Sequence, residues 1–379
     1  MIPPALWLRD RTGAAGPYGD FRIVHRMLVR LALFVVLAAS SSSLLAENLV
    51  LVGPLRLRDV SPLSLFRLDM PPAHGVNAIE QGWGLELGYT HSNLYLLSKT
   101  AEAWLQQRGR RENLSLAEAE ELLEEPGDVF LFDGEVSVLN LTVGYALSPR
   151  WQAMVTVPYH SYGGGLLDRP IENFHEAVGL GHDGRPYLPR NSIHVVARLG
   201  DQRQVIVTDD GSSGLGDAVL TVRYNRELSE KLFGVVEGAA RMPTGKQHLY
   251  FSKEDPEFGI QSSLQYQKGI HGYYASLSYI WVADEPFFPE VSDTPTLMLG
   301  FERRLSGTTS LLLQGTWSQS TIREVEQSDL TKARMQVSIG LRRQVGRVST
   351  SIALTENIIH LNNTPDVGLH FGIGWILPQ

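Results

Sequence analysis

The sequence predicts an all-β fold, a transmembrane antiparallel β-barrel of about 12 strands (roughly 12–14) with short helices in its extracellular loops. Three observations support this prediction. Apolar residues alternate with small or polar ones over most of the chain after residue 82, and short turns alternate with long connections. No stretch after residue 46 approaches the ~20 uninterrupted apolar residues that a membrane helix needs.

The first 46 residues are expected to be an N-terminal extension and a signal peptide. Met27 opens the stretch MLVRLALFVVLAASSSSLLA, and Arg22 and Arg26 precede it. A positive flank, a short apolar core and small residues at the end are typical of a cleavable signal peptide. We expect translation to start at Met27 and cleavage to follow Ala46. An uncleaved membrane anchor is the alternative, although the apolar run is short for a bilayer span.

The composition excludes several classes of function. The net charge of −8 gives no electrostatic reason to expect nucleic-acid binding. The absence of cysteine excludes a disulfide scaffold, thiol catalysis and a lipid anchor on an N-terminal cysteine. No nucleotide-binding, zinc-binding or nucleophile-elbow motif is present, so neither a cofactor nor a metal is expected.

The period-two alternation distinguishes two faces on each expected strand. Leu277, Tyr279 and Trp281 alternate with Ser276 and Ser278. A large soluble β-sandwich or a secreted barrel would alternate in the same way, but its solvent face would carry charged groups. Here the second face is mostly Gly, Ser, Thr, Asn and Gln, which favours one face toward lipid and the other toward a lumen.

The expected organisation has three parts: the extension and signal peptide at 1–46, an N-terminal periplasmic segment at 47–81, and an outer-membrane barrel at 82–379. Two insertions interrupt the barrel, at 98–128 and 162–213, and both are expected outside the cell. In the first, Ser115 and Glu118 fit a capping box before the helix-forming run LAEAEELLEE. In the second, a helix is expected at the barrel mouth. Its start and one face give four candidate residues: Asp168, Ile171, Phe174 and His175.

Ionisable residues in the inward phase of the strands are candidates for lining the lumen. A charge facing lipid near the membrane midplane would cost about 2–4 kcal/mol for Arg, so these residues should face inward. The candidates are Glu86, Asp217, Arg223, Glu237, Arg241, Glu302, Arg334, Arg342 and His370. They either line a water-filled pore and set its selectivity, or pair with one another and close the lumen.

Four stretches resemble a family of proteobacterial outer-membrane proteins known as domain of unknown function 3187. They are FRLDMPPAH (66–74), FDGEV (132–136), YGGGLLDRPIENFHEAVGLGHDGRPYLPRN (162–191) and GLGD (214–217). The resemblance implies an outer-membrane barrel of a Gram-negative bacterium and no particular activity.

Three functions share this fold: a passive channel or binder for a small or amphipathic solute, a lipid-modifying hydrolase, and a closed barrel that binds a partner. The hydrolase would use His160 and Ser161 with His175 and Glu176. However, neighbouring residues of a strand point to opposite faces, so His160 and Ser161 cannot form a direct couple. We expect the channel or binder, with outer-membrane lipid, the barrel-assembly machinery and a small solute as partners.

Overall fold

The computed structural model describes residues 53–59, 61, 64–65, 67–73, 82–178, 185–199, 202–207, 211–245, 252–284, 290–323, 328–359 and 364–376. The expected signal peptide lies outside these ranges. Among the described residues, no helix is long and apolar enough to cross a membrane.

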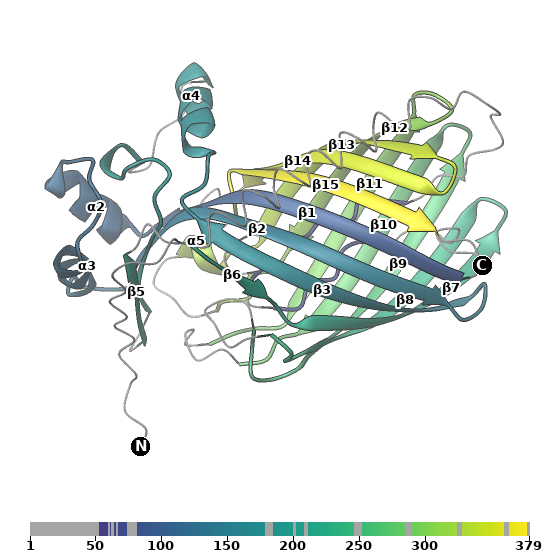
Figure 1. Cartoon of the computed structure of the whole chain (residues 1–379), viewed down its shortest axis with the longest axis horizontal. Coiled ribbons are helices and arrows are strands. Elements are labelled where there is room, and N and C mark those ends of the chain that lie inside the picture. The colour runs from purple at the N-terminus through teal and green to yellow at the C-terminus, as the bar shows by residue number, and fades with distance from the viewer. Residues whose placement is uncertain are drawn as a thin grey trace. The chain divides into compact units, whose positions relative to one another are not determined.

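Of the fifteen strands in the described ranges, twelve close an antiparallel barrel, and β4, β5 and β6 do not belong to the ring (Figure 1). The ring closes where β1 pairs with β15, from Gly84 opposite Ile376 to Ser92 opposite Gly368. The predicted fold class is therefore confirmed. The twelve barrel strands are β1 (Gly82–Leu97), β2 (Val129–Ala146), β3 (Trp151–Gly163), β7 (Ala218–Ser229), β8 (Leu232–Met242), β9 (Glu257–Lys268), β10 (His271–Trp281), β11 (Thr294–Arg304), β12 (Thr309–Ser318), β13 (Arg334–Val345), β14 (Val348–Ile359) and β15 (Val367–Ile376).

The two ends of the barrel differ. At one end, called here the turn end, neighbouring strands are joined by connections as short as 346–347, and β1 starts and β15 stops there. At the other, called here the loop end, the connections are long, such as 98–128 between β1 and β2. Outer-membrane barrels place short turns in the periplasm and long loops outside the cell, which gives the turn end a periplasmic orientation.

Additional elements gather at the loop end, opposite the C-terminal end of β15 (Figure 1). The hairpin of β4 (His194–Leu199) and β5 (Gln202–Val207) pairs with the start of β2, and β6 (Ser212–Leu215) pairs with the end of β3. The helices are α2 (Lys99–Arg108), α3 (Leu116–Leu123), α4 (Asp168–Val178) and the short α5 (Ser328–Thr331), with one 3-10 turn, η4 (Arg185–Tyr187). The capping box of Ser115 and Glu118 starts α3 as predicted. Helices α2 and α3 pack their apolar residues against β2 and β4.

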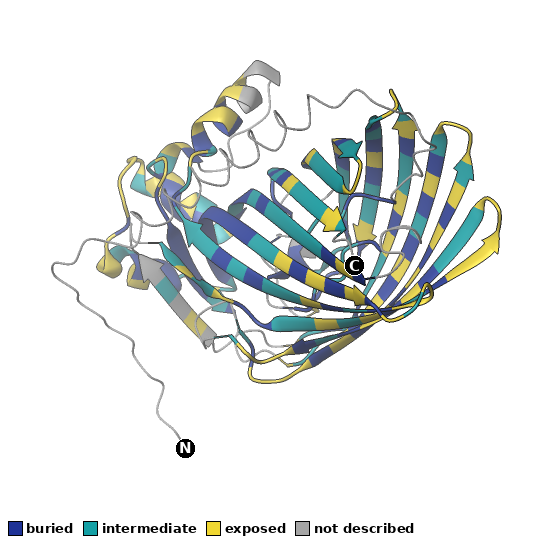
Figure 2. Cartoon of the chain, turned by 45° about the vertical axis from the view of Figure 1, so that its right-hand side comes forward, coloured by how far each residue is buried: buried dark blue, intermediate teal, exposed yellow. Residues whose placement is uncertain are grey.

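The barrel is apolar outside and polar inside, so that burial alternates along each strand (Figure 2). Leu277 and Leu299 on the outer face are 58 % and 57 % exposed, whereas Arg223 and Glu237 on the inner face are 1 % and 3 % exposed. A soluble barrel would show the opposite arrangement, because water would cover its outer face. The soluble β-sandwich alternative is therefore excluded.

Candidate functional site

The described part of the N-terminal segment lies inside the barrel. The carbonyl oxygens of Gly53 and Pro54 accept hydrogen bonds from Arg342, at 2.6 and 2.8 Å, near the turn end of β13. Asp59 Oδ2 lies 3.3 Å from Arg334 Nη1, at the loop end of the same strand. Residues 53–59 therefore run up the lumen beside β13. The prediction of a periplasmic segment over 47–81 is thus wrong for these residues.

The chain then turns and runs back toward the turn end. The backbone N–H of Leu68 donates to the carboxylate of Glu257, the first residue of β9. Four residues further along β9, Gln261 Nε2 donates to the carbonyl of Pro71 at 3.2 Å. Residues 53–73, called here the insert, therefore form a hairpin-shaped path whose two limbs both point to the turn end.

Leucines of the insert occupy apolar positions on the otherwise polar inner wall. Leu55 packs on Leu312 and Ala353. Leu68 packs on Ala239 and Ile280. A third cluster joins Leu65 to Val136 and Val138. Burial of a leucine is worth about 1.5–3 kcal/mol, so these three contacts favour an insert that stays in place.

Glycines of the wall make room for the insert. A Cβ added at Gly340 would lie 2.9 Å from Leu55 Cδ1, besides 2.8 Å from atoms of the neighbouring strand. One added at Gly259 would lie 2.5 Å from Met70 Sδ and 3.1 Å from Leu68 Cδ2. Both positions are therefore shaped to the segment that covers them.

The structure places all nine candidate lumen residues on the inner side, and each has a partner. Four ion pairs join wall to wall, and two join wall to insert. They are Arg241–Asp217 at 3.0 Å, Arg241–Glu257 at 3.3 Å, Arg223–Glu237 at 2.6 Å, Arg342–Glu302 at 3.5 Å, Arg56–Glu86 at 3.3 Å and Arg334–Asp59 at 3.3 Å. His370 hydrogen-bonds through both ring nitrogens, to Thr90 at 3.0 Å and Thr355 at 2.8 Å. The wall charges are thus arranged as pairs.

Two cavities of about 60 Å³ each remain beside the insert. A water molecule needs roughly 10–15 Å³ by this measure, so each cavity has room for a few waters. Arg58, Asp69 and His370 border both cavities. The lumen with the insert in place therefore has room for water and small ions, and larger solutes need more space.

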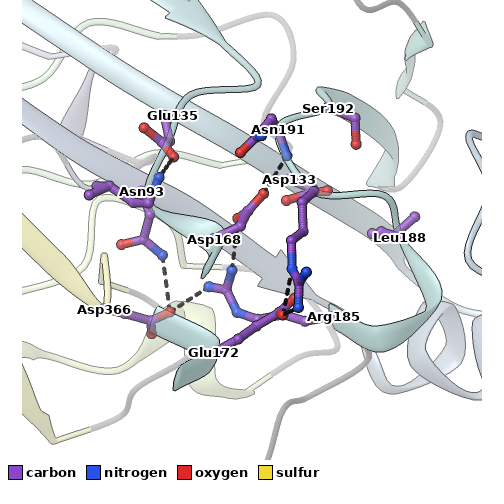
Figure 3. Close-up of polar contacts among 12 residues, drawn as sticks. Asn93, Asp133, Glu135, Asp168, Glu172, Arg185, Leu188, Asn191, Ser192 and Asp366 are labelled. Atoms are coloured by element: carbon purple, nitrogen blue, oxygen red, sulfur yellow. Dashed lines mark hydrogen bonds and ion pairs between the residues drawn. The ribbon is translucent and has the colours of Figure 1, made fainter. Parts of the chain in front are cut away.

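At the loop end, Arg185 anchors the large insertion to the barrel (Figure 3). Its guanidinium lies 3.3 Å from Asp168 Oδ1 and 2.5 Å from Asp366 Oδ2, and its Cζ lies 3.9 Å from the centre of the Tyr95 ring. Asp366 also accepts a hydrogen bond from Asn93 at 3.0 Å. One arginine thus joins the insertion to β1 and to the residue before β15.

The glycines at 164 and 165 allow the two ends of this insertion to meet. A Cβ at Gly164 would lie 1.8 Å from the carbonyl oxygen of Asn191, and one at Gly165 would lie 1.8 Å from the Glu135 carboxyl carbon. Gly165 also has φ of +66°, in the left-handed region that favours glycine. The three stretches around residues 135, 165 and 191 therefore form one packed unit.

Asp168, the first residue of α4, belongs to this unit. Its carboxylate accepts a hydrogen bond from the backbone N–H of Asn191 at 2.7 Å. Burial, together with the nearby Asp133, raises the pKa of Asp168 to about 6. Ile171 is buried, with 5 % exposure. The side chains of Phe174 and His175 lie outside the described part of the structure.

The groups suggested for a hydrolase do not form a described catalytic site. His160 is buried at 3 % exposure on the inner face, and Ser161 pairs with Ser213 of β6. No group of three or more His, Cys, Asp or Glu residues suited to a metal ion occurs within the described ranges. The lumen and its insert are therefore the candidate functional site.

A closed barrel with an apolar outer face and a polar lumen defines a transmembrane β-barrel of the type found in the outer membranes of Gram-negative bacteria. The chain belongs to a family described as "Protein of unknown function (DUF3187)", whose profile matches residues 27–375. The resemblance noted in the sequence is therefore confirmed. No curated protein sequence matches the chain.

Solved structures of barrels are similar to this chain at low identity. The COG4313 outer membrane channel from Pseudomonas putida F1 is 12 % identical with a TM-score of 0.49, over 82 % of this chain and 98 % of that one. The Ralstonia pickettii toluene transporter TbuX is 8 % identical with a TM-score of 0.38, over 85 % and 99 %. The CymD monoaromatic hydrocarbon channel is 11 % identical with a TM-score of 0.36, over 84 % and 97 %. These likenesses say nothing about the solute of this chain.

Proposed function

We propose that this chain is a passive outer-membrane channel for a small solute, with the insert as a resident element that narrows its lumen. The observation that supports the proposal is the pair of cavities beside the insert. They lie between a segment held by leucines and ion pairs and a wall rich in hydroxyl and amide groups.

The proposal includes the route to the membrane. A signal peptide cleaved after Ala46 leaves Glu47 as the first residue, only a few residues before the insert enters the barrel at Gly53. The outer-membrane lipid then contacts the apolar outer face, and the barrel-assembly machinery inserts the chain.

Conductance of the refolded mature chain in planar bilayers tests the proposal. The wild type is compared with Leu68→Asp. This change places a charge in the apolar contact between the insert and the wall, and should displace the insert. We expect small steady conductance from the wild type and larger conductance from Leu68→Asp. Leu116→Asp is the matched control, because Leu116 is 49 % exposed on α3 and far in sequence from the insert.

The closed partner-binding barrel remains the second candidate, because the insert occupies the lumen. It predicts no conductance from the wild type, Leu68→Asp or Leu116→Asp. Heat-modifiable migration on gels must show that each form is a folded barrel. Silence from folded forms would contradict the channel proposal and favour the binding barrel.

A further inference from the structure

Two charged residues of the insert, Arg58 and Asp69, stand between the cavities of the lumen. One lies on the rising limb of the insert and the other on the returning limb. Both residues border both cavities. Any solute or ion that occupies either cavity therefore comes close to this guanidinium and this carboxylate.

Arg58 and Asp69 keep unused hydrogen-bonding capacity. Arg58 Nε and Asp69 Oδ2 have no hydrogen-bond partner among the described residues. Each is the strongest charged neighbour of the other. The described residues nevertheless give neither of them an ion pair within 4.0 Å. These two atoms are themselves buried, so a solute meets the parts of the guanidinium and the carboxylate that border the cavities.

The remaining lumen charges are neutralised close to where they lie. Arg67 and Arg241, which also act on Arg58 electrostatically, are held by Asp59 at 3.3 Å and Asp217 at 3.0 Å. A closely paired charge has a weak field a few ångströms away, because the partner cancels it. The field inside the cavities is therefore dominated by the insert and not by the barrel wall.

The wall around the first cavity carries no Asp, Glu, Lys or Arg, and most of its side chains are polar, with Ile280 and Met298 as apolar members. It carries hydroxyl and amide side chains from β10 to β13: Ser278, Thr296, Gln314, Thr316, Gln336 and Ser338. Such groups replace the hydration of a hydroxyl-bearing or amide-bearing solute. One positive and one negative group beside them give no preference for either net charge.

We propose that Arg58 and Asp69 form the solute-recognition site of this channel and that the site selects small solutes of no net charge that carry hydroxyl or amide groups. This inference rests on the proposed channel function. Charge selectivity is then set by the insert, through two opposite charges that offset one another.

Reversal potentials in a KCl gradient test the inference with the full mature chain. We expect Arg58→Gln to make the channel cation-selective, because Asp69 is then unbalanced. Asp69→Asn should make it anion-selective, and the double variant should return to the wild-type value. A unit charge about 6 Å from an ion in water is worth roughly a threefold change in ion occupancy, so each single variant should shift the permeability ratio at least about threefold.

Solute uptake by liposomes gives a second readout. Arg58→Gln should slow nitrate, Asp69→Asn should slow potassium, and glycerol should enter at the wild-type rate in both. Arg58→Lys keeps the charge and should keep the wild-type reversal potential. Arg150→Gln, in the exposed turn between β2 and β3, removes a charge outside the lumen and serves as the control.

The outcomes separate the two proposals. Steady conductance with the same reversal potential in all forms would overturn this inference and leave the channel intact. Silence from every folded form would overturn the channel function and the inference with it. If Arg58→Gln does not fold, Asp69→Asn alone decides, because it predicts a shift of defined sign.

Discussion

Arg334 of the barrel wall and Asp59 of the insert form an ion pair of 3.3 Å at the loop end, with 3 % and 19 % of their side chains exposed. Asp59 also lies 3.3 Å from Arg67 of the returning limb. The side chains of Ser61 and Ser64 accept hydrogen bonds from Arg334 and donate to Asp59. One carboxylate thus joins the bend of the insert to β13.

Removal of this carboxylate should loosen the insert. Loss of one partner of a buried ion pair costs about 3–5 kcal/mol, and somewhat less where the pair is partly exposed. We expect Asp59→Ala to show frequent excursions to a larger conductance in single-channel records. Glu112→Ala, a change of an exposed acidic residue outside the barrel, is the control. Records indistinguishable from the wild type would show that the pair does not hold the insert.

A disulfide between the insert and the barrel wall should suppress the larger conductance expected of Asp59→Ala. The chain has no cysteine, so two introduced cysteines can pair only with one another. Leu68 and Ala239 pack in one cluster between insert and wall. We expect Leu68→Cys with Ala239→Cys, added to Asp59→Ala, to lose the large openings on oxidation and regain them on reduction. Each cysteine alone is the control, and openings that persist in the cross-linked form would mean that they do not require movement of the insert.

A larger side chain at a wall glycine that contacts the insert should also displace the insert. Val at Gly259 would overlap Met70 and Leu68, and overpacking of this kind costs about 1–3 kcal/mol. We expect Gly259→Val to raise the conductance and to leave the barrel folded. Gly315→Val is the matched control, because a Cβ at Gly315 meets nothing within 4 Å. Equal conductance in the two variants would contradict the packing described here.

The insertion at the loop end should respond to pH through Asp168. Its pKa of about 6 in the folded protein lies above the ordinary value of 3.8, so folding favours the protonated form. The free energy of opening the insertion should therefore decrease as pH rises from about 4 to about 6, and then level off. Hydrogen exchange of residues 164–192 between pH 4 and 8 measures this. The dependence should disappear in Asp168→Asn, and an unchanged profile in that variant would assign it to another group.

The two faces of the strands could be predicted from the sequence because lipid and lumen impose opposite chemistry on alternate residues. This rule alone correctly places Leu277 on the lipid face and Ser278 on the lumen face. The partners of the inward charges could not be predicted in the same way. Arg223 and Glu237 meet because they are direct neighbours across β7 and β8, and that register is known only once the strands pair.

The position of the insert inside the barrel could not be predicted for a related reason. The run LRLR at 55–58 alternates apolar and charged residues, which is a signal for an extended segment with two distinct faces. The sequence predicts a periplasmic segment there, because nothing in the segment itself indicates the wall that receives it. Leu55 and Leu68 are buried by residues of β8, β10, β12 and β14, more than 160 positions away in the sequence.

The two described limbs of the insert both point toward the turn end. A hairpin in this orientation is held to the wall by side chains and not by strand pairing. Its withdrawal would break hydrogen bonds and ion pairs between insert and wall, but none of the ladders between β1 and β15 or elsewhere around the ring. The width of this lumen is therefore set by a segment that contributes nothing to the wall that seals the membrane.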